Sequence, residues 1–327
     1  MKRSSLPYVP KCIFPLIPII LDSLKIIFLD NLMLFIIIYI VAALPTSIII
    51  TNLSISATPR RLKAYMMRLE WLSRVVPTLQ ETKNVWRTSQ DELQSLLHFR
   101  MLHAFPMLVF SLVTVITTVT LTSLAVNRKT EELGMSMKKC PVFWAVFTAL
   151  KVKWTWPFIS CIINYFILIM WGHVLPILTT MVGYPVTIVV TGVGLVLEVY
   201  LMSLFSLSLV ISVEEERVGL GFFSFGSGIM KGMRVCGWVL SAFILLCTNL
   251  IGREMVMIID SQDLEINGNY SNWTREMRIV NMMGLVFLLG WIVLWSNVVF
   301  TLFYYDCRER IVIREAFEKG LNSDIDI

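Results

Sequence analysis

One acidic residue lies inside a long apolar run of the sequence. The run covers residues 185–213, and Glu198, close to its midpoint, is the only acidic or basic residue in it. Thr187, Thr191 and Gly194 precede it at spacings of four, three and four, so all four share one helical stripe. A charge in hydrocarbon costs about 2.5 to 3.5 kcal/mol on insertion scales and needs a partner or a proton. Two chemistries follow: an interhelical hydrogen bond that fixes packing, or a proton- or cation-coupled site.

Candidate partners for Glu198 lie in the other apolar runs. They are Asn164 and His173 in one run, Asn249 and Asn297 in two others, and the hydroxyl groups of residues 105–126. Serine and threonine hydroxyls in such a run bond to carbonyls of their own helix or join neighbouring helices. They also fit a hydrophilic lining of a pathway, so both interpretations stay open.

No residue pattern typical of catalysis or cofactor binding occurs in the sequence. The three histidines are His98, His103 and His173, and the first two, five residues apart, diverge by about 140° around a helix. The glycine-rich stretch 219–232 follows an apolar run instead of a strand and has no G-K-[ST] element. We therefore expect no metal site, no cofactor and no enzymatic activity, and we interpret this stretch as a flexible elbow between two helices.

Composition assigns the chain to the membrane class. Hydrophobic residues make up 56% of the 327 residues and charged residues only 16%, with a mean hydropathy of +0.73, whereas soluble domains carry about 25% charged residues. The apolar runs reach about 20 residues, the length that crosses hydrocarbon. We predict an all-α fold, a polytopic membrane bundle of about six transmembrane helices with amphipathic interfacial helices. The net charge of +5 comes from basic residues that flank these runs, so no nucleic-acid partner is expected.

The predicted organisation has three parts. An N-terminal interfacial segment, 1–30, precedes the membrane domain, 31–305, and a short charged tail, 306–327, follows it. Residues 60–100 mix apolar and charged side chains and are predicted to form one or two amphipathic helices. The predicted spans lie near residues 32–50, 105–126, 158–178, 185–213, 235–251 and 282–305.

Orientation follows from the lysines and arginines beside the spans. With the N-terminus inside, the inner segments hold 17 of these residues and the outer segments 11, so both termini are predicted to be cytosolic. Two glycosylation sequons, at Asn269 and Asn272, fall in a loop that this orientation places outside. We expect the protein in the endomembrane system or the plasma membrane.

The six cysteines are scattered and do not predict a disulfide framework. No C-x-x-C pair occurs, and the predicted outer loop 252–278 contains no cysteine. Four of them lie near the predicted cytosolic boundary, where S-acylation occurs. These candidates are Cys307, which we favour, with Cys12, Cys140 and Cys236.

Three segments carry a family resemblance. They are L-S-L-V-I-S-V-E at residues 207–214, I-M-K-G at residues 229–232, and V-V-F-T-L-F-Y-Y-D-C at residues 298–307. They resemble the S-V-V-S-V-L-E element, the K-G elbow and the F-Y-Y-x-C-K ending of a plant family of multi-pass transmembrane proteins without assigned activity. The resemblance covers about the last two thirds of the chain and implies a six-span helical bundle. This chain departs from it with three consecutive glutamates, 214–216, and with Arg308 after Cys307.

Three functional hypotheses follow from the sequence. The first is a non-enzymatic membrane protein that organises lipid or partner proteins, with a membrane-protein partner or a second copy of the chain as candidates. The second is a transporter or channel subunit that uses Glu198 and the hydroxyl-rich run 105–126. The third, a membrane enzyme, is disfavoured because no nucleophile and base, and no pair of carboxylates, can be placed together.

Overall fold

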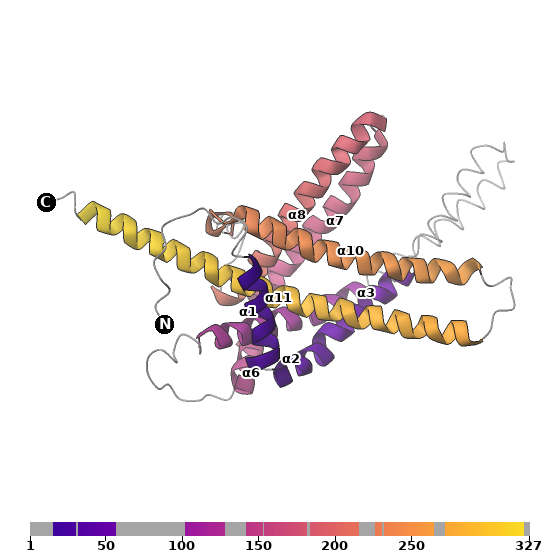
Figure 1. Cartoon of the computed structure of the whole chain (residues 1–327), viewed down its shortest axis with the longest axis horizontal. Coiled ribbons are helices and arrows are strands. Elements are labelled where there is room, and N and C mark those ends of the chain that lie inside the picture. Colours follow the sequence, from indigo (N-terminus) through magenta and orange to yellow (C-terminus); the bar gives the residue numbers. More distant parts are fainter. Residues whose placement is uncertain are drawn as a thin grey trace. The chain divides into compact units, whose positions relative to one another are not determined.

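The fold of the described residues is entirely helical, as composition predicts. A computed structural model describes residues 16–30, 32–56, 102–127, 142–152, 154–181, 184–215, 226–230, 232–264 and 272–323. Its α-helices are α1 Leu16–Lys25, α2 Leu32–Ile38, α3 Leu44–Ser56, α6 Val142–Val152, α7 Thr155–Met181, α8 Tyr184–Glu214, α10 Arg234–Leu264 and α11 Asn272–Ser323 (Figure 1). Two π-helical segments, η1 Ile26–Asp30 and η2 Tyr39–Ala43, the helix Leu102–Asn127 and a short helical turn at 226–229 are also described. The predicted amphipathic segment 60–100 lies outside the described residues.

Five helical segments are long and apolar enough to cross a membrane. They are Leu32–Asn52, Leu102–Asn127, Val186–Glu214, Arg234–Ile258 and Glu276–Ile313. Each overlaps one of the predicted spans. The remaining predicted span, 158–178, lies in α7, whose described apolar stretch is the shorter Thr155–Leu168. The sixth crossing therefore stays a prediction.

The first of these segments changes its helical form before Pro45. The α-helix of α2 gives way to the π-helical residues of η2, and α-helix resumes at Leu44. Proline lacks an N–H and cannot bond back to the preceding turn, so a wider turn is a local solution. A side-chain hydroxyl also donates to a carbonyl of η2: Thr46 Oγ1 bonds to the carbonyl of Ala42 at 2.8 Å. Pro45 is evident in the sequence, whereas the π-helix before it is not predicted from the residue pattern.

Two compact units can be distinguished in the chain. Unit 1 comprises Met1–Ile38, Leu112–Asn249 and Ile292–Ile327, and unit 2 comprises Tyr39–Ser111 and Leu250–Trp291. The core of unit 1 is one apolar cluster built from α1, the helix Leu102–Asn127, α8, the segment 229–233, α10 and α11. Fully buried members include Ile116, Ile211, Leu240, Phe303 and Tyr304.

A close approach between helices organises unit 2. A Cβ atom added at Gly290 of α11 would lie 3.1 Å from Ser47 Oγ and 3.4 Å from the carbonyl oxygen of Ala43. The Tyr39 hydroxyl donates to the carbonyl of Phe287 at 2.8 Å, and its ring meets Trp291 edge-on. Glycine therefore lets α11 pack directly against η2 and α3 in this unit.

The helices of the C-terminal third extend beyond their apolar runs. The predicted outer loop, 252–278, is shorter in the structure, because α10 continues to Leu264 and α11 begins at Asn272. At its other end α11 continues through the predicted tail to Ser323. Hydropathy marks where apolar side chains stop, whereas backbone hydrogen bonding continues through polar residues of good helix propensity.

Candidate functional site

Helices α7 and α8 form an antiparallel hairpin whose seam contains the predicted polar residues of two runs. Only residues 182 and 183 separate the two helices in sequence, and they lie side by side along their length (Figure 1). Asn164 of α7 is buried, and its Nδ2 donates to Ser208 Oγ at 2.9 Å and to the carbonyl of Phe205 at 3.4 Å. These bonds fix the register of the hairpin at this level.

Glu198 lies on the α7-facing side of α8. Phe205, whose carbonyl accepts from Asn164, is seven residues further along α8, so the two residues differ by only about 20° in direction around the helix. Gly194, on the same side, is buried, and Glu198 is half-buried. No described residue forms a hydrogen bond or an ion pair with the Glu198 carboxyl. By its helical position Glu198 thus belongs to the seam side of α8, and its carboxyl has no partner among the described residues.

The other members of the predicted stripe are more open. Thr187 is half-buried, whereas Thr191 is exposed and its Oγ1 donates to the carbonyl of Thr187 at 2.8 Å. This bond stays within one helix, so it satisfies the hydroxyl without a partner from another helix.

The remaining predicted partners of Glu198 are not brought to it. Asn297 is half-buried in α11, and its carbonyl accepts from Thr301 Oγ1 at 2.7 Å. Asn249 is exposed at the surface of α10. His173 belongs to α7, but its side chain lies outside the described residues. Of the predicted partners, Asn164 is the one for which the described part of the chain shows a hydrogen bond to α8.

The hydroxyl groups of the helix Leu102–Asn127 mostly bond within their own helix. Thr117, Thr118 and Thr122 are buried, and each donates to the carbonyl four residues earlier at 2.6 to 2.7 Å. Ser123 differs, because its Oγ lies 2.7 Å from the Tyr305 hydroxyl of α11. Ser123 thus joins this helix to α11.

A second polar site, the Tyr–Glu cluster, consists of Ser123, Glu214, Glu215, Tyr304 and Tyr305. The Tyr304 hydroxyl donates to Glu215 Oε1 at 2.7 Å, and the Tyr305 hydroxyl donates to Glu214 Oε2 at 3.0 Å. Because Tyr305 has a single proton and gives it to Glu214, Ser123 is the donor in the 2.7 Å contact with Tyr305. Two adjacent phenols of α11 thereby bind two adjacent carboxylates at the end of α8, and a third helix joins them.

Three members of the Tyr–Glu cluster, Glu214, Tyr304 and Tyr305, belong to two of the segments that carry the family resemblance. Residues 207–214, 229–232 and 298–307 all contribute to the core of unit 1. Their members in this core are Leu207, Val210, Ile211, Val213, Ile229, Met230, Val299, Phe300, Phe303, Tyr304 and Cys307. From sequence alone these motifs gave no chemistry. In the structure they meet as one packed junction whose polar edge is the cluster.

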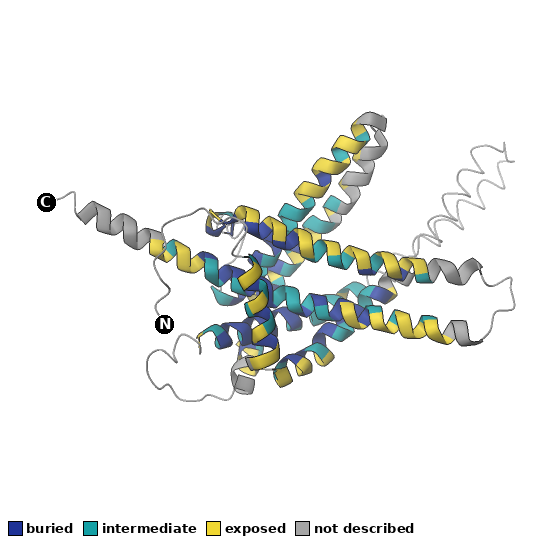
Figure 2. Ribbon diagram, viewed as in Figure 1, coloured by how far each residue is buried: buried dark blue, intermediate teal, exposed yellow. Residues whose placement is uncertain are grey.

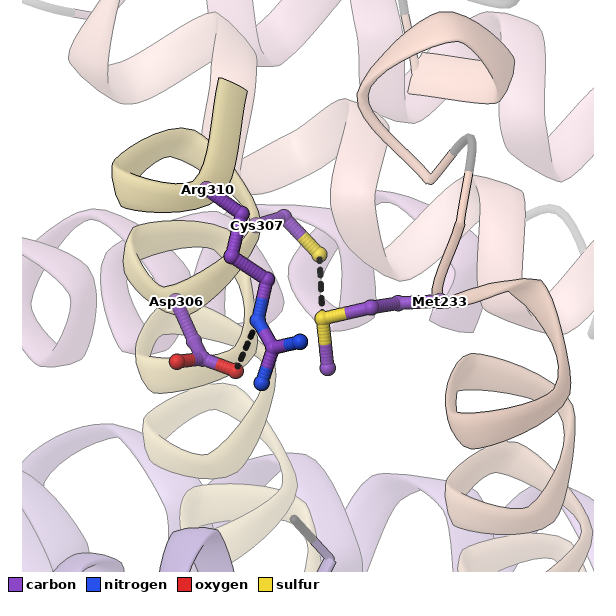
Figure 3. Close-up of polar contacts among 4 residues, drawn as sticks. All are labelled: Met233, Asp306, Cys307 and Arg310. Atoms are coloured by element: carbon purple, nitrogen blue, oxygen red, sulfur yellow. Dashed lines mark hydrogen bonds and ion pairs between the residues drawn. The ribbon is translucent and has the colours of Figure 1, made fainter. Parts of the chain in front are cut away.

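The favoured cysteine lies in the same junction. Cys307 and Cys236 are 2% and 3% exposed, and Cys307 Sγ lies 3.9 Å from Met233 Sδ (Figure 3). One turn away, Arg310 Nε and Asp306 Oδ2 form an ion pair of 3.4 Å on the partly exposed side of the helix. An acyl chain could reach Cys307 only after the thiol left its contact with Met233. Cys12 and Cys140 lie outside the described residues.

The structure describes the backbone at one of the two predicted glycosylation sites. Asn269 lies outside the described residues, and Asn272 is the first residue of α11 with a side chain that is not described. Among the described residues, no three histidine, cysteine, aspartate or glutamate side chains gather in a group that could hold a metal ion. The arrangement that the structure does build is a helix junction with bonded carboxylates.

Comparison with known proteins gives one match. No curated protein and no solved structure matches the chain. A family described as a domain of unknown function, DUF8558, matches residues 13–319, which is nearly the whole length. The chain therefore belongs to the DUF8558 family.

Proposed function

We propose that this protein is a multi-pass integral membrane protein without enzymatic activity, which organises lipid or partner proteins. The bilayer itself and a membrane protein, or a second copy of the chain, are its partners, and nucleic acid is not. Six crossings with both termini in the cytosol, in the endomembrane system or the plasma membrane, complete the proposal. Membership of the plant group of transmembrane proteins that the sequence resembles is also part of the proposal.

The observation that carries the proposal is the apolar surface of the α7–α8 hairpin. Ile188, Val189, Val193, Leu195, Val196 and Leu197 of α8 are all between 39% and 64% exposed. At 100° per residue their directions cover about 200° of the helix circumference. Soluble monomers rarely expose an apolar patch of more than a few hundred Å². Figure 2 shows the exposed positions continuing along the outer half of α8.

The apolar surface continues on α7. Phe166, Met170 and Leu178 are 48% to 64% exposed, and the hairpin has no charged residue between 158 and 197. A helix pair that is apolar over most of its circumference is stable where lipid or another membrane protein covers it. Such a surface supports a role in organising lipid or partner proteins. That role does not require a catalytic site.

A second candidate function, a transporter or channel subunit, is favoured by Glu198. Its carboxyl is half-buried within the hairpin and has no partner among the described residues. Intramembrane carboxyl groups of this kind serve as coupling sites in transporters. The bonded threonines of the helix Leu102–Asn127 do not add to this candidate, because their hydroxyls are already satisfied by their own backbone.

The two functions are separated by isolating the protein in native lipid particles and by reconstituting it in vesicles. An organiser yields a constant protein partner or an enriched lipid class in the particles, and Glu198→Gln leaves that composition unchanged. A transporter instead gives a pH-gradient-dependent flux across the vesicles that Glu198→Gln abolishes. Flux of this kind, without any constant companion in the particles, would overturn the first proposal.

A further inference from the structure

Two buried polar groups on α7 depart from the bonding pattern of the bundle. Buried hydroxyls elsewhere, such as those of Thr46, Thr118 and Thr301, donate to carbonyls of their own helix. Ser160 is fully buried, yet its Oγ has no hydrogen-bond partner among the described residues. Asn164 is 5% exposed, and its Oδ1 likewise has none, although its Nδ2 is bonded to α8.

These two atoms are neighbours on one face of the helix. Ser160 and Asn164 are four residues apart, a spacing that brings Cβ atoms to about 5 to 6 Å. Asn164 faces α8, as its bonds to Phe205 and Ser208 establish. An unpartnered hydroxyl, which can donate, and an unpartnered amide oxygen, which can only accept, therefore lie one turn apart at the seam.

The same face of α7 carries a third unpartnered polar atom. Trp171 is seven residues beyond Asn164, and its buried Nε1 has no hydrogen-bond partner among the described residues. In an antiparallel hairpin, seven residues along α7 correspond to seven residues back along α8. Asn164 lies opposite Phe205, so Trp171 lies at about the height of Glu198. An indole N–H without an acceptor and a carboxyl without a donor lie at one height of the seam.

We propose that the α7–α8 seam binds ordered water at these two levels. At the first level, a water molecule accepts from the Ser160 hydroxyl and donates to Asn164 Oδ1. At the second level, a water molecule accepts from Trp171 Nε1 and bonds to the Glu198 carboxyl. Leaving the three buried atoms, Ser160 Oγ, Asn164 Oδ1 and Trp171 Nε1, unbonded costs about 1 to 3 kcal/mol each. Buried water that bridges otherwise unsatisfied groups is the usual remedy.

The chemistry of the groups selects water over a cation. Two of the four, the Ser160 hydroxyl and the Trp171 indole, offer protons, and a cation would repel the indole N–H. A hard cation also takes about six or more oxygen ligands, whereas only two unpartnered oxygens, Ser160 Oγ and Asn164 Oδ1, are available at this level among the described residues. Water is both donor and acceptor, so it matches each pair.

The inference goes beyond the proposed function, because a hydrated seam is compatible with either an organiser or a transporter. Its ligand is held within one helix pair, so its failure leaves the case for membrane embedding unchanged. It gives Glu198 a hydrogen-bond partner that the described protein groups do not supply. It also means that the carboxyl, at the middle of its helix, is in contact with an exchangeable solvent molecule.

A double-mutant cycle tests the first water. In the unaltered chain, Ser160→Ala is expected to lower the folded-to-unfolded ratio about fivefold, the effect of one net hydrogen bond. In an Asn164→Leu background the same change is expected to have almost no effect, because the bridge is already lost. Ser241→Ala is the matched control: Ser241 Oγ is buried and unpartnered in α10, with no second unpartnered atom one turn away. We expect less than a twofold change there.

A direct observation uses the unaltered chain in a lipid nanodisc. Electron cryomicroscopy at a resolution that shows other bound waters should show density within hydrogen-bonding distance of both Ser160 Oγ and Asn164 Oδ1. A second peak should lie between Trp171 Nε1 and the Glu198 carboxyl. Empty positions at that resolution would overturn the inference. So would a Ser160→Ala effect that is absent, or that is the same size in both backgrounds.

Discussion

The most specific polar contact in the molecule is the pairing of two neighbouring tyrosines with two neighbouring glutamates. Tyr304 is fully buried, and its hydroxyl is bonded to Glu215 at 2.7 Å. Tyr305, beside it, is bonded to Glu214 and to Ser123. A hydrogen bond to a charged group contributes more than a neutral one. At the scale of single residues, this cluster joins the end of α8 and the helix Leu102–Asn127 to the interior of α11.

Removal of one phenol hydroxyl should weaken this junction. Tyr304→Phe keeps the ring and deletes the bond to Glu215, so we expect a loss of about 1 to 2 kcal/mol in the free energy of unfolding. The measurement is a denaturant titration in mixed micelles. Tyr200→Phe is the matched control: Tyr200 contacts Trp238 edge-on through its ring, and its hydroxyl makes no hydrogen bond to a described residue. Equal losses in the two variants would show that the Glu215 bond contributes nothing.

Substitutions of Glu198 test whether its side chain stabilises the hairpin by hydrogen bonding or only by filling space. Glu198→Gln should preserve the free energy of unfolding, because an amide still bonds within the seam. Glu198→Leu should lower it by about 1 kcal/mol, a value typical of interhelical polar contacts. The same titration measures both variants. A leucine variant as stable as the unaltered chain would mean that the Glu198 carboxyl makes no stabilising contact.

At the scale of elements, glycine sets the distance at the junction of unit 1. A Cβ atom added at Gly237 of α10 would lie 3.1 Å from Ser203 Oγ and 3.2 Å from both Met230 Sδ and Phe303 Cζ. Three neighbours from three segments would have to move together. Small residues at helix contacts permit such close approach in membrane proteins.

A single methyl group should therefore be costly at Gly237. We expect Gly237→Ala to lower the thermal unfolding midpoint in detergent, with a loss of about 1 to 3 kcal/mol from overpacking. Gly192→Ala is the control in α8, where an added Cβ meets no atom within 4 Å. That change should leave the midpoint unchanged or raise it, because alanine has the higher helix propensity. A Gly237→Ala midpoint no lower than that of Gly192→Ala would contradict the close approach.

The sequence predicts the elements better than the contacts between them. Uninterrupted apolar runs specify where helices form, and each of the five long apolar helices overlaps a predicted run. Helix ends are harder to predict from apolar runs. For example, α11 passes from apolar to charged residues without a break in its backbone hydrogen bonds. The π-helical turn η2 depends on how Pro45 is accommodated, which composition does not encode.

The candidate site is predictable in part for a similar reason. Asn164 and Glu198 stand out because polar residues in apolar runs need partners, and both lie in the α7–α8 seam. The Tyr–Glu cluster does not stand out. Its members come from three helices and lie at or just beyond the ends of the predicted apolar runs, where tyrosine and glutamate are ordinary boundary residues. Only the family-like motifs mark these positions in the sequence, and their meaning depends on three-dimensional packing.

At the scale of the whole molecule, the predicted topology can be tested with single cysteines. In a cysteine-free background, cysteines at positions 138 and 308 should react with an impermeant reagent from the cytosolic side, and one at position 269 from the opposite side. The reason is the excess of basic residues in the predicted inner segments. Asn269→Gln with Asn272→Gln should also remove any N-linked glycan. Labelling of positions 269 and 308 from the same side would exclude an odd number of crossings between them.

The central claim is that the exposed apolar surface of α8 faces lipid or another membrane protein instead of water. Spin labels at Val193, which is 64% exposed, and at Arg310, whose side chain is 55% exposed, test it in reconstituted vesicles. The measurement compares collision rates with oxygen, which concentrates in hydrocarbon, and with a water-soluble nickel complex. We expect the nickel complex to relax the label at position 310 but not the label at position 193. A label at position 193 that the nickel complex reaches as readily as the label at position 310 would contradict it.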